Sequence, residues 1–129
     1  MKRKVLVVDD TAVVRDFYRS IFGNLGFEVV EAAVEAPLLN AEDFTEFFKE
    51  ERDGTALVVS DGNLGEDSFT GVDVVRLVRS LDSSIPIFAV TSDSDLGKKM
   101  VTAGADRLFH KPFSVEEFVS EMKVRGIIE

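Results

Sequence analysis

Short aliphatic runs alternate along the chain with longer segments in which apolar residues recur every three or four positions. The runs are rich in Val, Ile and Phe and span four to six residues, which is typical of strands buried on both faces of a parallel sheet. They predict strands at residues 4–8, 28–32, 56–60, 86–91 and 107–110.

The segments between these runs predict five helices. In the first helix, apolar residues at 3/4 spacing form one stripe, and Gly26 follows as a C-terminal stop. Asn40 is a candidate N-cap of the second helix and Ser114 of the fifth, where Glu117 completes a capping-box pattern. The fourth segment has weaker periodicity and contains Gly97. The apolar positions are Val14, Phe17, Ile21 and Leu25 in the first helix, Phe44, Phe47 and Phe48 in the second, Val72, Val75, Leu77 and Val78 in the third, and Val115, Phe118 and Met122 in the fifth.

Strand and helix alternate five times with short connections, which predicts an open, doubly wound α/β sheet. In such a sheet, ligands bind beyond the carboxyl ends of the strands, where the strand order reverses. No internal repeat or low-complexity tract interrupts the pattern, so residues 1–129 are interpreted as one domain.

Composition and charge narrow the possible functions. The chain has 129 residues, a hydrophobic fraction of 45% and a net charge of −9 from 24 acidic and 15 basic side chains. An acidic surface disfavours binding to nucleic acid or to anionic membranes. The basic N-terminal residues precede only a short aliphatic run, too short for a signal sequence or a membrane span. We therefore expect a cytoplasmic protein that binds neither nucleic acid nor membrane.

Cysteine and histidine usage restricts the chemistry further. The absence of cysteine excludes disulfides, thiolate nucleophiles and Cys-ligated zinc, and the single histidine excludes a multi-histidine metal site. Any metal must therefore be held mainly by oxygen.

Polar residues follow four of the predicted strands. They are Asp9, Asp10 and Thr11 after the first strand, Asp61, Gly62 and Asn63 after the third, Thr91 and Ser92 at the end of the fourth, and Lys111 and Pro112 after the fifth. Taken singly, the acids and hydroxyls fit helix caps or turns, and the lysine fits a solvated surface residue. Together they place three carboxylates, a hydroxyl and an ammonium group at one edge of the sheet.

A cluster of this kind favours phosphoryl chemistry. Neighbouring carboxylates raise one another's pKa, and a hard divalent cation relieves their repulsion. Oxygen ligation selects Mg2+ or Mn2+ over zinc. A carboxylate beside such an ion can attack a phosphoryl group, whose oxygens a lysine and a hydroxyl then stabilise.

Four short stretches at the ends of strands one, three, four and five, VLVVDD, VVSDGN, AVTS and HKPF, resemble the CheY-like receiver domain of two-component response regulators. The resemblance covers nearly the whole chain and implies a flavodoxin-like fold with strand order 2-1-3-4-5. The chain ends soon after the fifth helix, so we expect residues 1–129 to form a receiver domain with no output domain.

The resemblance also implies a role for each site residue. Asp10 and Asp61 are expected to ligate magnesium (or manganese) directly, together with the main-chain carbonyl of Asn63. Asp9 is expected to act on the metal mostly through water.

On the phosphoryl side, the resemblance implies that Asp61 accepts a phosphoryl group from the phosphohistidine of a histidine kinase or histidine phosphotransfer protein. Thr91 is expected to bind a phosphoryl oxygen, and Lys111 to pair with the phosphate. The bond between Lys111 and Pro112 is expected to be cis, which would aim the lysine inward.

Several features depart from the family pattern. Leu108 stands three positions before the lysine, where the family usually has an aromatic switch residue, and strand alternation is expected to point Phe109 to the other face. In contrast, Asn63 and Asp93 match the family pattern, and the resemblance implies that they influence the approach of water to the acyl phosphate.

Two connecting segments are longer than the family's. The loop after Asp61 is expected to place residues 66–68 over the site. Residues 34–44 either extend the second helix or form a loop.

The leading hypothesis is a phosphoacceptor that catalyses only its own phosphorylation and dephosphorylation and is not a turnover enzyme. By resemblance, the face of helix four, strand five and helix five is expected to contact a downstream protein or a second copy of the domain. The alternative is a degenerate receiver that binds partners without phosphorylation. A magnesium-dependent phosphatase is disfavoured, because its Asp-x-Asp pattern is absent after strand one.

Overall fold

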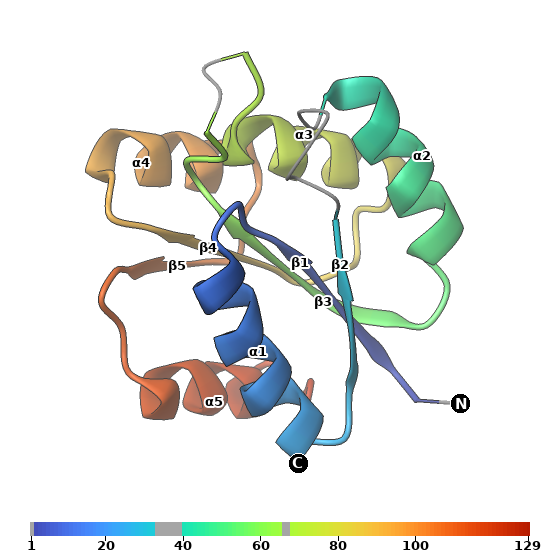
Figure 1. Cartoon of the computed structure of the whole chain (residues 1–129), viewed down its shortest axis with the longest axis vertical. Coiled ribbons are helices and arrows are strands. Elements are labelled where there is room, and N and C mark those ends of the chain that lie inside the picture. The colour runs from blue at the N-terminus through green and yellow to red at the C-terminus, as the bar shows by residue number, and fades with distance from the viewer. Residues whose placement is uncertain (1, 33–39, 66–67) are drawn as a thin grey trace.

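The computed structural model describes residues 2–32, 40–65 and 68–129. Within these ranges, five strands alternate with five helices (Figure 1). In chain order they are β1 (Lys4–Val8), α1 (Ala12–Asn24), β2 (Glu28–Glu31), α2 (Ala41–Glu51), β3 (Thr55–Asp61), α3 (Gly71–Leu81), β4 (Ile87–Thr91), α4 (Ser94–Ala103), β5 (Arg107–His110) and α5 (Val115–Val124). No helix in these ranges is long and apolar enough to cross a membrane.

The strands form one parallel sheet in the order β2-β1-β3-β4-β5, which confirms the predicted flavodoxin-like fold. Figure 1 shows α1 and α5 on one face of the sheet and α2, α3 and α4 on the other. The strand order reverses at β1, whose neighbours β2 and β3 lie on opposite sides. The carboxyl ends of β1 and β3 therefore meet at the point where ligands bind in this type of sheet.

Each face of the sheet has its own apolar core. Successive residues of β1 alternate between the two, because side chains along a strand point to opposite faces. The α1/α5 face is rich in aromatic rings, with Phe109 and Phe118 centred 4.8 Å apart. The opposite face packs Phe44 and Phe48 of α2 against aliphatic residues of α3.

The predicted stripe of α1 is offset from the face that is buried. Tyr18 and Phe22 face the sheet together with Arg15, whereas Phe17 and Leu25 are 41% and 36% exposed. Apolar residues occur side by side in this helix, so two series fit a 3/4 spacing. The buried series contains an arginine, which a hydropathy pattern counts as an outward position.

The predicted bounds of the helices and strands hold with small adjustments. Strands one and five have the predicted bounds, whereas the third extends through Asp61. The predicted stop holds, since Gly26 adopts a φ of 89° after α1. Asn40 caps α2 by accepting a hydrogen bond from the Asp43 amide at 2.8 Å. Residues 34–39 of the long segment and residues 66 and 67 of the long loop lie outside the described residues.

Capping differs in two places from the prediction. Ser114 Oγ accepts from the Glu117 amide at 3.1 Å, but the reciprocal bond of a capping box is absent among the described residues. A complete box instead begins α3, where the Thr70 amide donates to Asp73 at 2.8 Å and the Thr70 hydroxyl accepts from the helix. Asp93, rather than the Thr91–Ser92 pair, caps α4.

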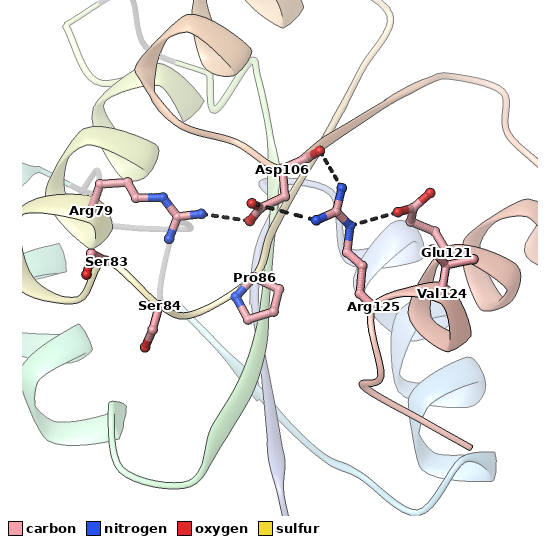
Figure 2. Close-up of a pocket in the computed structure, with 8 residues that line it drawn as sticks. All are labelled: Arg79, Ser83, Ser84, Pro86, Asp106, Glu121, Val124 and Arg125. Carbon is pink, nitrogen blue, oxygen red and sulfur yellow. Dashed lines mark hydrogen bonds and ion pairs between the residues drawn. The ribbon is translucent and has the colours of Figure 1, made fainter.

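At the amino ends of β4 and β5, ion pairs surround Asp106 (Figure 2). Asp106 Oδ2 accepts hydrogen bonds of 2.7 Å from Arg79 Nη2 and from the Ile87 amide. Arg125 reaches it from α5, with Nη1 3.8 Å from Oδ1 and Nη2 donating to the Asp106 carbonyl at 2.9 Å. We call Asp106, Arg79 and Arg125 the Asp106 clamp.

Both arginines of the Asp106 clamp use their remaining donors locally. Arg79 donates to the carbonyls of Gly104 at 2.9 Å and Ile85 at 2.6 Å. Arg125 Nε donates to Glu121 at 2.7 Å. The clamp therefore joins α3, the start of β4, the start of β5 and α5 through satisfied polar groups.

Candidate functional site

The carboxyl ends of β1 and β3 bring three aspartates together. The two strands are neighbours, with Val8 opposite Ser60, so the residues that follow them meet. Asp9, Asp10 and Asp61 each offer a carboxylate oxygen within 4.8 Å of the others. We call these three residues the carboxylate cluster.

Burial differs within the carboxylate cluster. Asp9 and Asp61 are only 1% and 8% exposed, whereas Asp10 is exposed to solvent. The Asp9 Oδ1 atom accepts a hydrogen bond from the Thr11 amide at 2.8 Å. Its other oxygen, Oδ2, is buried and makes no hydrogen bond within the described part of the chain.

Lys111 brings an ammonium group to two carboxylates of the cluster. Its Nζ lies 3.2 Å from Asp61 Oδ2 and 3.6 Å from Asp9 Oδ2. The Lys111 amide donates to the Thr91 carbonyl at 3.1 Å, which ties the end of β5 to β4. The Lys111–Pro112 peptide bond is cis.

Burial dominates the electrostatics of the two inner carboxylates. It raises the pKa of Asp61, and the charge of Asp9 raises that pKa further, while Lys111 opposes both effects. The pKa of Asp9 is raised by burial as well, against the Thr11 amide and Lys111. The positive charge of Lys111 thus does not offset the burial of the Asp9 and Asp61 carboxylates.

This deficit fits a hard divalent cation. The possible ligand atoms are all oxygens and lie within 4.8 Å of one another, and one buried Asp9 oxygen accepts no hydrogen bond from the described residues. The main-chain carbonyl of Asn63 follows Asp61 closely in sequence, as the predicted ligand set requires.

Thr91 stands beside the end of β3 and is 1% exposed. Its Oγ1 accepts a hydrogen bond from the Asp93 amide at 3.1 Å. A Cβ on Gly62 would lie 2.8 Å from that oxygen, so glycine at this position admits the hydroxyl close to Asp61. The structure thus brings the predicted phosphoryl-binding hydroxyl to the same edge as the carboxylate cluster.

Gly71, at the start of α3, lies against the main chain that follows β3. Its amide donates to the Gly62 carbonyl at 2.8 Å. A Cβ on Gly71 would collide with the Asp61 carbonyl oxygen and lie 2.6 Å from Met100 Cε. Sequence reasoning missed this residue, although its place directly after the Thr70 cap was a usable signal of a close helix approach.

The predicted tuning residues lie around the rim. Asn63 is exposed, and its Oδ1 accepts from the Gly65 amide at 3.0 Å. Asp93 Oδ1 accepts from the amides of Asp95 at 3.0 Å and Leu96 at 3.1 Å as it caps α4. Both residues line one polar pocket between α3 and α4.

Leu108 is half-buried on the α4 face of β5. A Cβ on Gly97 would lie 2.9 Å from Leu108 Cδ2 and 3.3 Å from Thr91 Cγ2, so the interior glycine of α4 allows the helix to lie on both side chains. Phe109 points to the other face and is 2% exposed among Phe88, Phe113 and Phe118. The expected alternation is confirmed, and an aliphatic residue contacts α4 at the switch position.

Arg15 is a further residue that sequence reasoning missed. It is 6% exposed, and its Nη1 donates to the main-chain carbonyl of Asp9 at 2.9 Å. The signal available in the sequence was an arginine within the series of positions that contains Tyr18 and Phe22.

The family model of the response regulator receiver domain matches residues 5–123, so the chain belongs to this family of two-component signalling domains. The chain is 30% identical over 122 residues to the transcriptional regulatory protein PhoP of Escherichia coli, covering 93% of this chain and 50% of that protein. It is also 30% identical over 127 residues to the response regulator MprA of Mycobacterium bovis, covering 95% and 50%. The chain thus spans about half the length of these curated relatives.

Solved receiver domains share the fold. The BeF3-activated DrrB receiver domain superposes with a TM-score of 0.73 at 25% identity, covering 96% of this chain and 97% of that one. The chemotaxis protein CheY4 of Vibrio cholerae superposes with a TM-score of 0.74 at 24% identity, covering 96% and 98%.

Proposed function

We propose that this domain is a phosphoacceptor in which Asp61 receives a phosphoryl group from a phosphohistidine on a partner protein. The observation that carries the proposal is a buried Asp61 carboxylate 3.2 Å from Lys111 Nζ and within 4.8 Å of the other two carboxylates. Asp61 is the one member of the carboxylate cluster that both ends a strand and pairs most closely with the lysine.

In the proposed transfer, an Asp61 carboxylate oxygen attacks phosphorus, and the bond from phosphorus to the imidazole nitrogen breaks. The bonding electrons return to the imidazole, which leaves as the neutral base because its other nitrogen carries a proton, either already bound or taken up from solvent. A magnesium ion held by Asp10, Asp61 and the Asn63 carbonyl, with Asp9 acting through water, would neutralise charge on the cluster and the phosphoryl oxygens.

Lys111 and Thr91 are proposed to stabilise the transferred group. Lys111 Nζ already lies beside the acceptor oxygen, so its ammonium group can pair with phosphoryl oxygens without a large movement. The Thr91 hydroxyl accepts from the Asp93 amide, which leaves its own proton to donate to a phosphoryl oxygen. Water then hydrolyses the acyl phosphate, so the domain returns to its starting state without turning over a separate substrate.

The experiment is incorporation of acid-labile phosphate from acetyl phosphate or a histidine-kinase donor with Mg2+. Asp61→Asn preserves the shape of the acceptor and removes its nucleophile, whereas Asp53→Asn changes an exposed aspartate elsewhere. We expect wild type and the Asp53 variant to be labelled and the Asp61 variant to lose the label. Equal labelling of all three proteins would overturn the assignment.

An apolar patch beside Lys111 is proposed to receive the phosphohistidine partner. It is formed by Val13, Val14, Phe17, Pro112 and Phe113, and Val13 is 76% exposed. Val13→Ser should slow transfer from a kinase but not from acetyl phosphate, which needs no docking surface. Val101→Ser, at an exposed valine of α4, is the matched control. Equal slowing with both donors would show that Val13 acts on the site rather than on docking.

Output is proposed to pass through the face formed by α4, β5 and α5 to a downstream protein, or to a second copy of the domain. Leu108 favours one alternative, a domain that binds its partner without phosphorylation, because the family's aromatic switch residue is missing. Partner binding that changes on phosphorylation of Asp61 would exclude that alternative.

A further inference from the structure

Arg15 is a buried cation that reaches from α1 to the main chain of the carboxylate cluster. Its side chain is 7% exposed, and Nη1 donates to the Asp9 carbonyl at 2.9 Å in a buried hydrogen bond. Hydrogen bonds from charged donors are stronger than those between neutral groups, and leaving a buried acceptor without its donor is costly. The contact therefore fixes the peptide that joins Asp9 to Asp10.

The same guanidinium is anchored on a third element. Arg15 Nε lies 3.7 Å from Glu31 Oε2, and Glu31 is the last residue of β2. Glu31 also accepts a 2.7 Å hydrogen bond from Arg19 Nε, but Arg19 is 53% exposed. Among the described residues it pairs with Asp16 and Glu31, which lie outside the carboxylate cluster. Arg15 thus links α1, the end of β1 and the end of β2.

Asp9 is restrained at two points. Arg15 holds its carbonyl, and the Thr11 amide holds its carboxylate Oδ1 at 2.8 Å. The peptide plane that contains this carbonyl also carries the amide of Asp10, so its orientation sets where both side chains start. Adjacent carboxylates repel each other, and a free turn would relax by moving them apart.

We propose that Arg15 is a positioning residue that holds Asp9 and Asp10 in the orientation required to bind the divalent cation. This inference rests on the proposed function, because it assumes that the carboxylate cluster binds Mg2+. Arg15 acts through the Asp9 main chain and contacts neither the metal nor the phosphoryl group.

The test is Mg2+ binding by the unphosphorylated domain, followed through the amide resonances of Asp9, Asp10 and Thr11. Arg15→Met removes the charge and the hydrogen bond but keeps much of the apolar bulk. Arg19→Met is the matched control, since it removes the other cation on Glu31. Groups that orient metal ligands change affinity by about 10–100-fold when mutated. We expect Mg2+ affinity to fall about 10-fold in Arg15→Met and to change less than about twofold in Arg19→Met.

Arg15→Lys keeps the charge without the guanidinium fork, and we expect an intermediate affinity from it. If circular dichroism shows that Arg15→Met does not fold, the Mg2+ affinity of Arg15→Lys tests the inference instead. Folded Arg15 variants that bind Mg2+ as tightly as Arg19→Met would overturn the inference and leave the proposed function intact. A wild-type domain that fails to bind Mg2+ would instead overturn the proposed site itself.

Discussion

The two edges of the sheet gather similar residues and balance them in opposite ways. At the carboxyl edge, three carboxylates face one lysine, and a buried Asp9 oxygen makes no hydrogen bond within the described ranges. At the amino edge, Asp106 lies between Arg79 and Arg125 (Figure 2). The main-chain amide of Ile87 also donates to this carboxylate. The carboxyl edge therefore has too few hydrogen-bond donors for its carboxylate oxygens, whereas the Asp106 carboxylate at the amino edge is fully paired.

This difference separates two uses of charge in one small domain. Satisfied ion pairs with several hydrogen bonds hold elements in place, as the Asp106 clamp does for α3 and α5. An undercompensated cluster costs stability until a ligand supplies the missing charge, and such imbalance marks functional sites. This contrast supports the proposed ligand-binding role of the carboxyl edge and favours a structural role for the amino edge.

The largest expected effect comes from the backbone that supports the carboxyl edge. Gly71→Ala places a methyl group against the Asp61 carbonyl and Gly62 Cα, both of which are main-chain atoms that cannot rotate away. Overpacking of this kind costs about 3 kcal/mol of unfolding free energy. Urea denaturation measures it. Gly23→Ala, where a Cβ meets nothing within 4 Å, is the control and should be neutral or slightly stabilising.

The next effect tests whether the amino edge is structural. Asp106→Asn leaves Arg79 and Arg125 without their shared carboxylate, and the side chain is 29% exposed, so we expect a loss of about 2 kcal/mol of unfolding free energy. Phosphorylation of Asp61 by acetyl phosphate should proceed at its normal rate in the folded variant. A large loss of phosphorylation without a loss of stability would contradict the structural role of the amino edge.

The site could be predicted from the sequence because its geometry follows from topology. The carboxyl ends of parallel strands share one edge, so Asp10, Asp61, Thr91 and Lys111 had to converge once the alternation of strand and helix was recognised. That convergence does not depend on any single side-chain conformation.

The supports of the site were not predictable in the same way. The role of Gly71 depends on how closely α3 approaches β3, which is an interatomic distance and leaves no periodic pattern. Arg15 occupies a buried position that hydropathy assigns to solvent. The Asp106 clamp joins residues 79, 106 and 125, which lie far apart in the sequence and each fit an ordinary surface charge.

The contributions of Asp9 and Asp82 to the free energy of unfolding should change with pH in opposite directions. The raised pKa of Asp9 means that its destabilising charge is absent below its ordinary pKa of 3.8 and develops as the pH rises through the native-state pKa. Asp9→Asn should therefore stabilise the metal-free protein by about 1 kcal/mol at neutral pH, with the gain shrinking toward acid. Saturating Mg2+ should also remove the gain, because the ion supplies the missing charge to the wild type.

Asp82, in the loop between α3 and β4, should contribute to stability with the opposite pH dependence. Hydrogen bonds from the Ser84 hydroxyl and amide lower the pKa of Asp82, so its stabilising contribution is present above 3.8 and is lost as the pH falls through the native-state pKa. Asp82→Asn should destabilise the protein at neutral pH and become neutral in acid. Unfolding free energies of Asp9→Asn and Asp82→Asn, measured from neutral pH to acid, check whether the two substitutions act in opposite directions. Changes of the same sign at neutral pH would contradict the comparison.

The smallest effect concerns Tyr18, whose buried hydroxyl has no hydrogen-bond partner among the described residues. Burial raises the pKa of Tyr18, and the negative charges of Asp9 and Asp61 raise it further. The charge of the carboxylate cluster therefore acts on the Tyr18 hydroxyl as well. Tyr18→Phe keeps the packing on Phe22 and Phe118 and removes the unsatisfied group. We expect a gain of about 0.5 kcal/mol in unfolding free energy. A loss would mean that the hydroxyl is bonded to buried water, and that the deficit of donors is confined to the carboxylate cluster.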